Sequence, residues 1–403
     1  MQDNTTLDPL KRKQFYPSIH AFRGIGSIFI LVFHSIGLFS PGNPLIENLR
    51  PISLIFLIYF FMVSGFVNFR PLATKLLTGE NPPVSAKGFL LRRFARIFPA
   101  YWFALLLWTI IPGDDRFVNG NIIPHIFLFH VFLKDGADFL FAGLFVSWSL
   151  AIEVAYLFPV MFFYFLVGRF KKSISNFLYG TIVAVFFLLI LASNFYHYTV
   201  VSKNVKDGEQ WLFFAQWDKF ATGELLAILL GWLYLNKINI FRKIAKFKPI
   251  FWFVAFIIPL VFLTLYRVPN WTYDNVSWVK PVVVDIVILI PCLALLGFAV
   301  TSPTSLNNFF DGKLLQRLGF YSFDIFLLHP PAIKLVGFFR ENGYLPKFLI
   351  NTYGGPFLVF IISMALAWFS YSVVTRPALH LINRFGSSSS RPTLENNTSD
   401  NLR

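Results

Sequence analysis

The stretch FRGIGSIFILVFHS, residues 22–35, decides the class of fold. It belongs to an apolar span over residues 19–38, which is long enough to cross the hydrocarbon core of a bilayer as a helix. It nevertheless carries Arg23 at one end and His34 deep inside. Titratable groups are costly in lipid and are seldom kept there without a function. The stretch therefore predicts a membrane helix that carries part of a site.

The rest of the chain has the same apolar character. Of its 403 residues, 56% are hydrophobic and only 14% are charged, which is too little polar surface for a water-soluble protein of this length. The apolar runs predict an all-α fold, a polytopic membrane helical bundle of about ten transmembrane helices. The expected spans cover residues 19–38, 51–69, 97–112, 143–167, 174–192, 213–235, 249–266, 281–300, 318–338 and 353–375. A shorter apolar stretch, Ile122–Leu133, is predicted to be re-entrant or interfacial.

The basic residues predict the orientation. Most of the 35 Lys and Arg residues fall on the cytoplasmic side if the N-terminus is cytoplasmic. Ten crossings then place both termini in the cytoplasm. We expect a cytoplasmic segment over residues 1–18, a membrane domain over 19–382 and a disordered cytoplasmic tail over 383–403. The net charge of +15 is explained by this asymmetry and by lipid headgroups, so the bilayer is an expected partner and nucleic acid is not.

Arg23 and His34 share one helical face. Their spacing of eleven residues places them about 20° apart around a helix and roughly 16 Å apart along it. A snorkelling arginine and a packed histidine would explain them without a site. Arg93 and Arg96, three residues apart before the third span, are either membrane anchors or a pair suited to gripping phosphates.

Five further titratable residues lie within apolar spans. Glu153 requires a partner or a water-lined cavity, and its alternative role is that of a structural partner for a buried arginine. Asp324 and His329 lie in the ninth span, Asp285 in the eighth and Glu224 in the sixth. Each of the three acids Asp285, Glu224 and Asp324 is a possible acceptor-binding group, whereas His329 is a supporting site residue or a helix-packing group. The single cysteine, Cys292, offers neither a disulfide framework nor a Cys-based metal site, and no metal or cofactor is expected.

These residues fall into ordered motifs. Arg, ten intervening residues and His occur in the first span as Arg23 and His34, and Arg-x-x-Arg occurs as Arg93 and Arg96, followed by PAYW at 99–102. The stretches FFMVSGFV (60–67), WSLAIE (148–153) and YSFDIFLLHPP (321–331) follow the same order along the chain. Together they resemble acyltransferase family 3, the integral-membrane O-acyltransferases that modify glycans. The resemblance covers about residues 18 to 382, but Thr375-Arg376-Pro377 stands where the family often has Glu-x-Pro, so that acidic role is not carried over.

The resemblance implies a function. A cytoplasmic acyl-CoA, most often acetyl-CoA, would donate its acyl group to a hydroxyl of an extracytoplasmic glycan or glycolipid such as lipopolysaccharide O-antigen or exopolysaccharide. Arg23, Arg93 and Arg96 would bind the CoA phosphates. His34 would act as general base or accept the acyl group itself, and Glu153 would orient it. The expected location is a bacterial inner membrane.

A second class of function also uses intramembrane acids and histidines. In a proton-coupled secondary transporter or glycan flippase they would relay protons. Inverted repeats or helices broken in matching halves would favour this class, and the sequence contains no such pattern that we recognise.

Overall fold

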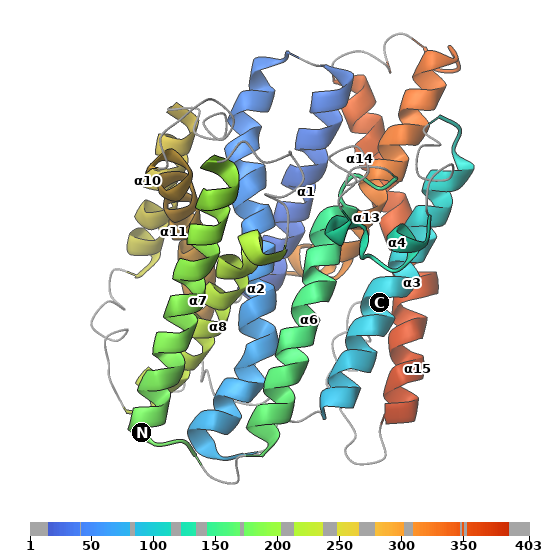
Figure 1. The fold of residues 1–403 in the computed structure, drawn as a ribbon. Helices are drawn as coiled ribbons and strands as arrows, with labels where there is room; N and C mark the ends of the chain where they lie inside the picture. The colour runs from blue at the N-terminus through green and yellow to red at the C-terminus, as the bar shows by residue number, and fades with distance from the viewer. Residues whose placement is uncertain are drawn as a thin grey trace.

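The structure is a computed structural model that describes residues 15–40, 42–80, 85–113, 122–133, 143–169, 173–202, 213–236, 248–265, 279–301, 309–346, 349 and 353–386. This part of the chain is all-helical, without a strand, and its long helices stand side by side in one bundle (Figure 1). The helices are α1 (Pro17–Phe39), α2 (Pro44–Thr78), α3 (Ala86–Ile110), α4 (Ile122–Ile126), η1 (His130–Phe132), α6 (Ser147–Gly168), α7 (Asn176–Ser202), α8 (Phe213–Leu235), α10 (Lys248–Leu265), α11 (Val279–Thr301), α13 (Lys313–Glu341), α14 (Gly354–Ser370), the π-helix η6 (Tyr371–Thr375) and α15 (Arg376–Gly386).

A helix lies at every predicted span. Six helical stretches in the described ranges are long and apolar enough to cross a membrane, in α1, α2, α6, α7, α13 and the continuous stretch from α14 into α15. The chain is therefore a helical membrane protein with several apolar spans, while the count of ten crossings stays a prediction. Ile122–Leu133 forms only two short turns, α4 and η1, in agreement with its short apolar length.

Local chemistry sets several helix ends. The side chain of Asn43 accepts a hydrogen bond from the Leu45 backbone amide at the start of α2, with Pro44 in the first turn. Gly79 ends the same helix with a φ of 78°, a left-handed conformation that glycine adopts without steric cost. Ser85 then caps α3 by accepting from the amide of Gly88. These caps fix where α2 begins and ends and where α3 begins.

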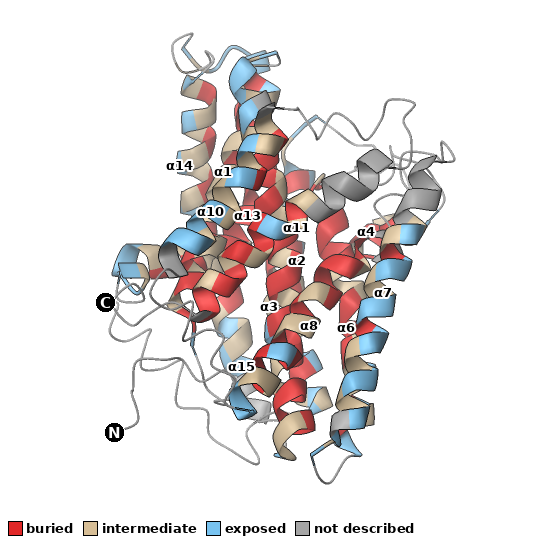
Figure 2. Cartoon of the chain, turned by 90° about the vertical axis from the view of Figure 1, so that its left-hand side faces the viewer, coloured by how far each residue is buried: buried red, intermediate tan, exposed pale blue. Residues whose placement is uncertain are grey.

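The core lies along α2 and α13, which are largely buried, whereas α7 turns an exposed face outward at one edge of the bundle (Figure 2). The exposed residues of α7 are mainly Phe, Leu and Val, as a surface facing lipid tails requires. The two ends of the bundle are named here by their turns. The α1–α2 end is where α1 ends and α2 begins, and the α2–α3 end is where α2 ends and α3 begins.

Helices α1 and α13 run parallel at close range because glycines meet at their interface. A Cβ atom on Gly24 would lie 2.7 Å from the Leu318 carbonyl carbon, and one on Gly319 would lie 2.5 Å from the His20 carbonyl oxygen. Neither contact leaves room for a methyl group. This approach fixes the depth of α1 against α13, on which the site depends.

The C-terminal elements differ from the predicted boundary in one detail. Helix α15 continues to Gly386, so residues 383–386 of the predicted tail are helical. The remainder of the tail, 387–403, and residues 1–14 of the predicted N-terminal segment lie outside the described residues.

Candidate active site

The structure pairs His34 of α1 with His329 of α13. His34 Nδ1 lies 3.0 Å from His329 Nε2, and the two ring planes are within 5° of parallel. Each histidine stands ten residues beyond a glycine of the α1–α13 contact, since Gly24 leads to His34 and Gly319 to His329. Two parallel helices in close register therefore carry the two imidazoles to the same depth. His329 was expected as a supporting residue, and the structure brings it to His34.

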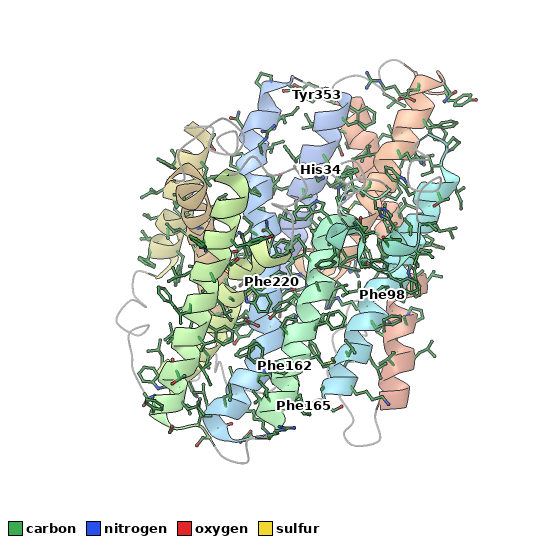
Figure 3. All side chains as sticks on the ribbon, in the orientation of Figure 1. His34, Phe98, Phe162, Phe165, Phe220 and Tyr353 are labelled. Carbon is green, nitrogen blue, oxygen red and sulfur yellow. The ribbon has the colours of Figure 1, made fainter. Side chains whose placement is uncertain are left out.

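His34 borders a pocket at the α1–α2 end of the bundle. Figure 3 labels His34 in the half of the bundle nearer Tyr353, away from Phe165 at the opposite end. The pocket has a volume of about 490 Å³. Phe145 packs edge-on against His34 at 5.1 Å between ring centroids, and Arg50 contributes a positive charge to the pocket wall. An aromatic wall, a cation and an imidazole suit a small polar group carried on a larger molecule.

The three arginines form a second centre, towards the α2–α3 end. The charge of Arg23 interacts with those of Arg96, Arg93 and Glu153. Arg93 donates a hydrogen bond to the side chain of Asn68 on α2. All three arginines are only half-buried although they lie within membrane helices. The predicted association of Arg23 with Arg93 and Arg96 is thus present in the fold.

Glu153 occupies a different place from the predicted one. Ser64 of α2 donates a hydrogen bond of 2.7 Å to Glu153 Oε1, and the charge of Glu153 interacts with those of Arg23 and Arg93. No contact given by the described side chains joins Glu153 to His34. The charges of these arginines stabilise the carboxylate. The expected pairing of Glu153 with His34 is therefore corrected: Glu153 accepts a hydrogen bond from Ser64 and interacts electrostatically with Arg23 and Arg93.

Asp324 is hydrogen-bonded to residues of α14 and η6. Its Oδ1 accepts hydrogen bonds from Ser370 at 2.6 Å and Thr375 at 3.0 Å. The intervening π-helix η6 winds with i→i+5 bonding, which brings residues five apart towards one face. Thr375, which stands where the related family often has an acidic residue, thus serves as a partner for the acid on α13. Asp324 is not part of the pocket wall at His34. The backbone of Asp285 lies in α11, but its side chain is outside the described residues.

The short segment over α4 and η1 contacts helices α3 and α6. Tyr101 of α3 donates to the His125 carbonyl at 2.6 Å, and the Ser147 hydroxyl lies 3.2 Å from His130 Nε2. Burial lowers the pKa of His125 to about 4 and that of His130 to about 3, so both rings are neutral near pH 7. Their rings stack at 4.4 Å. These contacts tie the segment to α3 and α6 rather than forming a charged site.

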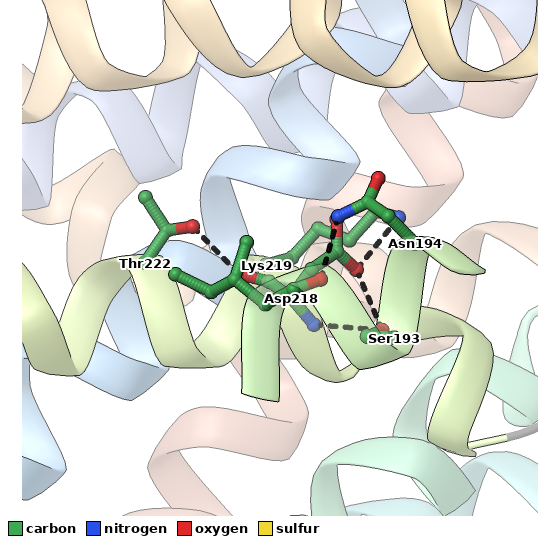
Figure 4. A network of polar contacts seen from close by, with 6 residues as sticks. Ser193, Asn194, Asp218, Lys219 and Thr222 are labelled. Atoms are coloured by element: carbon green, nitrogen blue, oxygen red, sulfur yellow. Dashed lines mark hydrogen bonds and ion pairs between the residues drawn. The ribbon is translucent and has the colours of Figure 1, made fainter. Parts of the chain in front are cut away.

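A buried polar network between α7 and α8 escaped the sequence reasoning (Figure 4). Lys219 Nζ lies 2.9 Å from Asp218 Oδ1, and Ser193 donates to the same oxygen at 3.3 Å. The signal was present in QWDKF, residues 216–220, where two opposite charges stand side by side in an apolar run. Asn68, the partner of Arg93, was also missed, because a neutral polar residue does not stand out in a membrane span. Ser64, the partner of Glu153, was noted only as part of the motif FFMVSGFV. Glu224, a further intramembrane acid, accepts from Tyr156 at 2.7 Å.

No group of three or more His, Cys, Asp or Glu side chains within the described ranges is arranged to hold a metal ion. Helix α1 carries a member of both the arginine centre and the imidazole pair, Arg23 and His34.

Comparison with known proteins identifies the family. The family described as Acyltransferase domain, acyltransferase family 3, matches residues 16–372. The chain belongs to this family. The acyltransferase is 22% identical over 399 residues to O-acetyltransferase OatA of Staphylococcus aureus strain NCTC 8325 / PS 47, and equally to OatA of strain COL. These alignments cover 93% of the acyltransferase but 59% of the relatives, so the chain spans about three fifths of their length. No solved structure matches it.

Family membership places the chain among acyltransferases rather than among secondary transporters, the alternative that the intramembrane charges left open. The matched range contains all the arginines and histidines of both centres.

Proposed function

We propose that this protein is a membrane-bound O-acetyltransferase that moves an acyl group, taken here as acetyl, from cytoplasmic acyl-CoA to a hydroxyl of an extracytoplasmic glycan such as O-antigen or exopolysaccharide. One observation carries the proposal: helix α1 links a cluster of cations at one depth to an imidazole pair beside a pocket at another. The two centres are separated by roughly 16 Å along the helix axis. A donor and an acceptor arriving from opposite faces of a membrane require such a separation.

The arginine centre suits the CoA moiety of the donor. Arg23, Arg93 and Arg96 bring three positive charges together, and the acids in electrostatic contact with them are Glu153 and Asp324. The centre therefore keeps a net positive charge inside an apolar bundle, which an anion would compensate. Guanidinium groups bind phosphates through charge-assisted hydrogen bonds, and CoA carries several phosphates. The acyl-bearing arm of the donor would then extend along α1 towards His34.

The pocket at His34 suits the acceptor. Neutral His34 takes the proton of the sugar hydroxyl while that oxygen attacks the thioester carbonyl carbon. The carbon–sulfur bond then breaks, and the departing CoA thiolate takes the proton back from the imidazolium. In a two-step alternative, His34 itself attacks the thioester carbonyl carbon and the carbon–sulfur bond breaks to release the CoA thiolate. The sugar hydroxyl then displaces the imidazole from the acyl-histidine, and the hydroxyl proton passes to the thiolate. Both routes place the reacting atoms at the same imidazole.

The named relatives support the acetyl group and the oxygen acceptor, since both are O-acetyltransferases by name. We place the protein in a bacterial inner membrane with both termini in the cytoplasm, in keeping with the distribution of Lys and Arg along the chain. The arginine centre then faces the CoA pool, and the His34 pocket faces the outside.

Substitution of His34 tests the proposal. His34→Gln should lower glycan acetylation by about 100-fold or more, because the proton acceptor is lost while the residue stays polar and similar in size. Mass spectrometry of surface glycans from matched strains with and without the protein measures the acetyl groups. His380→Ala, which alters an exposed histidine of α15, is the matched control and should keep full activity. Near-normal acetylation by a membrane-inserted His34→Gln variant would overturn the proposal.

A further inference from the structure

The hydrogen bonds of His329 determine which of its nitrogens carries the proton. His329 Nδ1 lies 3.3 Å from the backbone carbonyl oxygen of Ile325, one turn earlier on α13. A carbonyl oxygen only accepts hydrogen bonds, so Nδ1 is the nitrogen that bears hydrogen. A neutral imidazole has a single N–H, which leaves Nε2 of His329 with a lone pair.

The contact with His329 also determines which nitrogen of His34 carries hydrogen. His329 Nε2 lies 3.0 Å from His34 Nδ1, and a lone pair on Nε2 requires that His34 Nδ1 carries the hydrogen. The basic nitrogen of His34 is then Nε2. Phe145 contacts both imidazoles, Phe326 contacts His329, and His329 is fully buried. Two adjacent imidazolium ions would repel each other there and lose their hydration.

We propose that His329 is a positioning residue that holds His34 in the tautomer whose Nε2 is basic. This inference rests on the proposed function, and it gives the second imidazole the part that a carboxylate plays in catalytic triads. The carboxylate expected for this part, Glu153, instead accepts a hydrogen bond from Ser64 and interacts electrostatically with the arginines. When His34 becomes protonated at Nε2, its Nδ1–H continues to donate to His329, and the hydrogen bond becomes charge-assisted.

An imidazole suits this place better than a carboxylate for an electrostatic reason. His329 is fully buried and contacts Phe145, Phe326 and the backbone of α13, so an ionised carboxylate in its place would lose its hydration. A neutral imidazole accepts the same hydrogen bond without that cost. The anchor on the Ile325 carbonyl supplies the fixed orientation.

Nitrogen NMR tests the tautomer without any substrate. The full chain, labelled with ¹⁵N-histidine and reconstituted in lipid nanodiscs, contains seven histidines. The signals of His34 are assigned by their loss in His34→Gln. We expect an unprotonated Nε2 and a protonated Nδ1 for His34 in the native chain, and a mixture of tautomers in His329→Leu. A protonated Nε2 in the native chain, or a ratio unchanged by His329→Leu, would overturn the proposal.

Kinetics supply the second readout. With acetyl-CoA and envelope polysaccharide from the expressing strain, His329→Leu should lower kcat by roughly 100-fold and leave the KM for acetyl-CoA unchanged. His329→Gln offers an amide oxygen to His34 Nδ1 and should recover part of the rate, which a purely structural role would not predict. In the NMR measurement His329→Gln should keep His34 protonated at Nδ1, and a mixture of tautomers in this variant would contradict the assignment. An equal loss in both folded variants, or none, contradicts the assignment.

The two proposals fail in different ways. If no acetyl transfer to the glycan is found while the NMR tautomer is the expected one, the proposed function is wrong, and so is a catalytic part for His329. If transfer occurs but His329→Leu changes neither the tautomer nor kcat, only the positioning role is wrong. Gly337→Ala, on the same helix with open space around the glycine, should match the native chain in both measurements.

Discussion

Arg93 and Arg96 differ from ordinary membrane anchors in their surroundings. An anchoring arginine extends its side chain to the interface and binds lipid headgroups. Arg93 instead donates to the buried Asn68, and its charge interacts with those of Arg96 and Glu153. Both arginines therefore face the interior of the bundle, where the donor is proposed to bind.

Replacing Arg93 and Arg96 together by alanine should weaken acyl-CoA binding by roughly 2–4 kcal/mol, because two charge-assisted contacts are lost. Isothermal titration with acetyl-CoA measures the change. Arg169→Ala is the control, because Arg169 follows the end of α6 with its guanidinium over the Phe165 ring rather than near Arg23. If the affinity of the double variant equals that of Arg169→Ala, the arginines are anchors.

The close pair α1 and α13 is the structural basis of the imidazole pair. Nothing in either helix alone brings His34 to His329, since the two are 295 residues apart. The contact at Gly24 and Gly319 sets both the distance and the register of the helices. The same pair would be lost if one helix moved by a single turn.

Gly319→Val should separate α1 from α13 and destabilise the protein by about 1–3 kcal/mol, as overpacking does in cores. Acetylation should fall by more than the loss of folded protein would explain, because His34 loses its hydrogen-bond partner. Thermal unfolding in detergent and glycan acetylation are measured side by side. Gly337→Ala is the matched control, since no atom lies within 4 Å of its Cβ position and alanine favours a helix over glycine by about 1 kcal/mol. Full activity in folded Gly319→Val would show that the close contact is not needed.

The whole bundle presents its two centres to opposite ends. Pocket residues at the α1–α2 end include the exposed Leu38, whereas Lys87 is exposed in the first turn of α3 at the other end. The native thiol of Cys292 is buried and donates to the Ile55 carbonyl, so it offers little background for labelling. The orientation of the protein in the membrane can therefore be determined by labelling single introduced cysteines.

Leu38→Cys should react with a membrane-impermeant maleimide added outside intact cells, and Lys87→Cys should react only in inverted membrane vesicles. The positive-inside distribution is the physical reason for this assignment. Mass-shift assay on gels measures both, with the unsubstituted chain as the background. Labelling of both cysteines from the same side would contradict a donor and an acceptor that arrive from opposite faces.

The class of fold and most of the candidate site residues could be predicted from the sequence. Long apolar runs can satisfy their backbone polar groups in lipid only as helices, so composition was enough to locate every helix that matches a predicted span. Charged and titratable groups stand out against such runs, which is why Arg23, His34, Glu153 and His329 were identified from their positions alone. The short length of Ile122–Leu133 likewise excluded a spanning helix.

Which of these residues meet could not be predicted, because it depends on how separate helices pack. Whether the partner of His34 is Glu153 or His329 depends on the rotation and depth of separate helices, and these are set by packing between distant segments such as the glycines of α1 and α13. The same holds for Asp324, whose partners come from the π-helical turn of another element. A periodic pattern within one helix describes its faces but not its neighbours, because long-range packing is a property of the folded bundle.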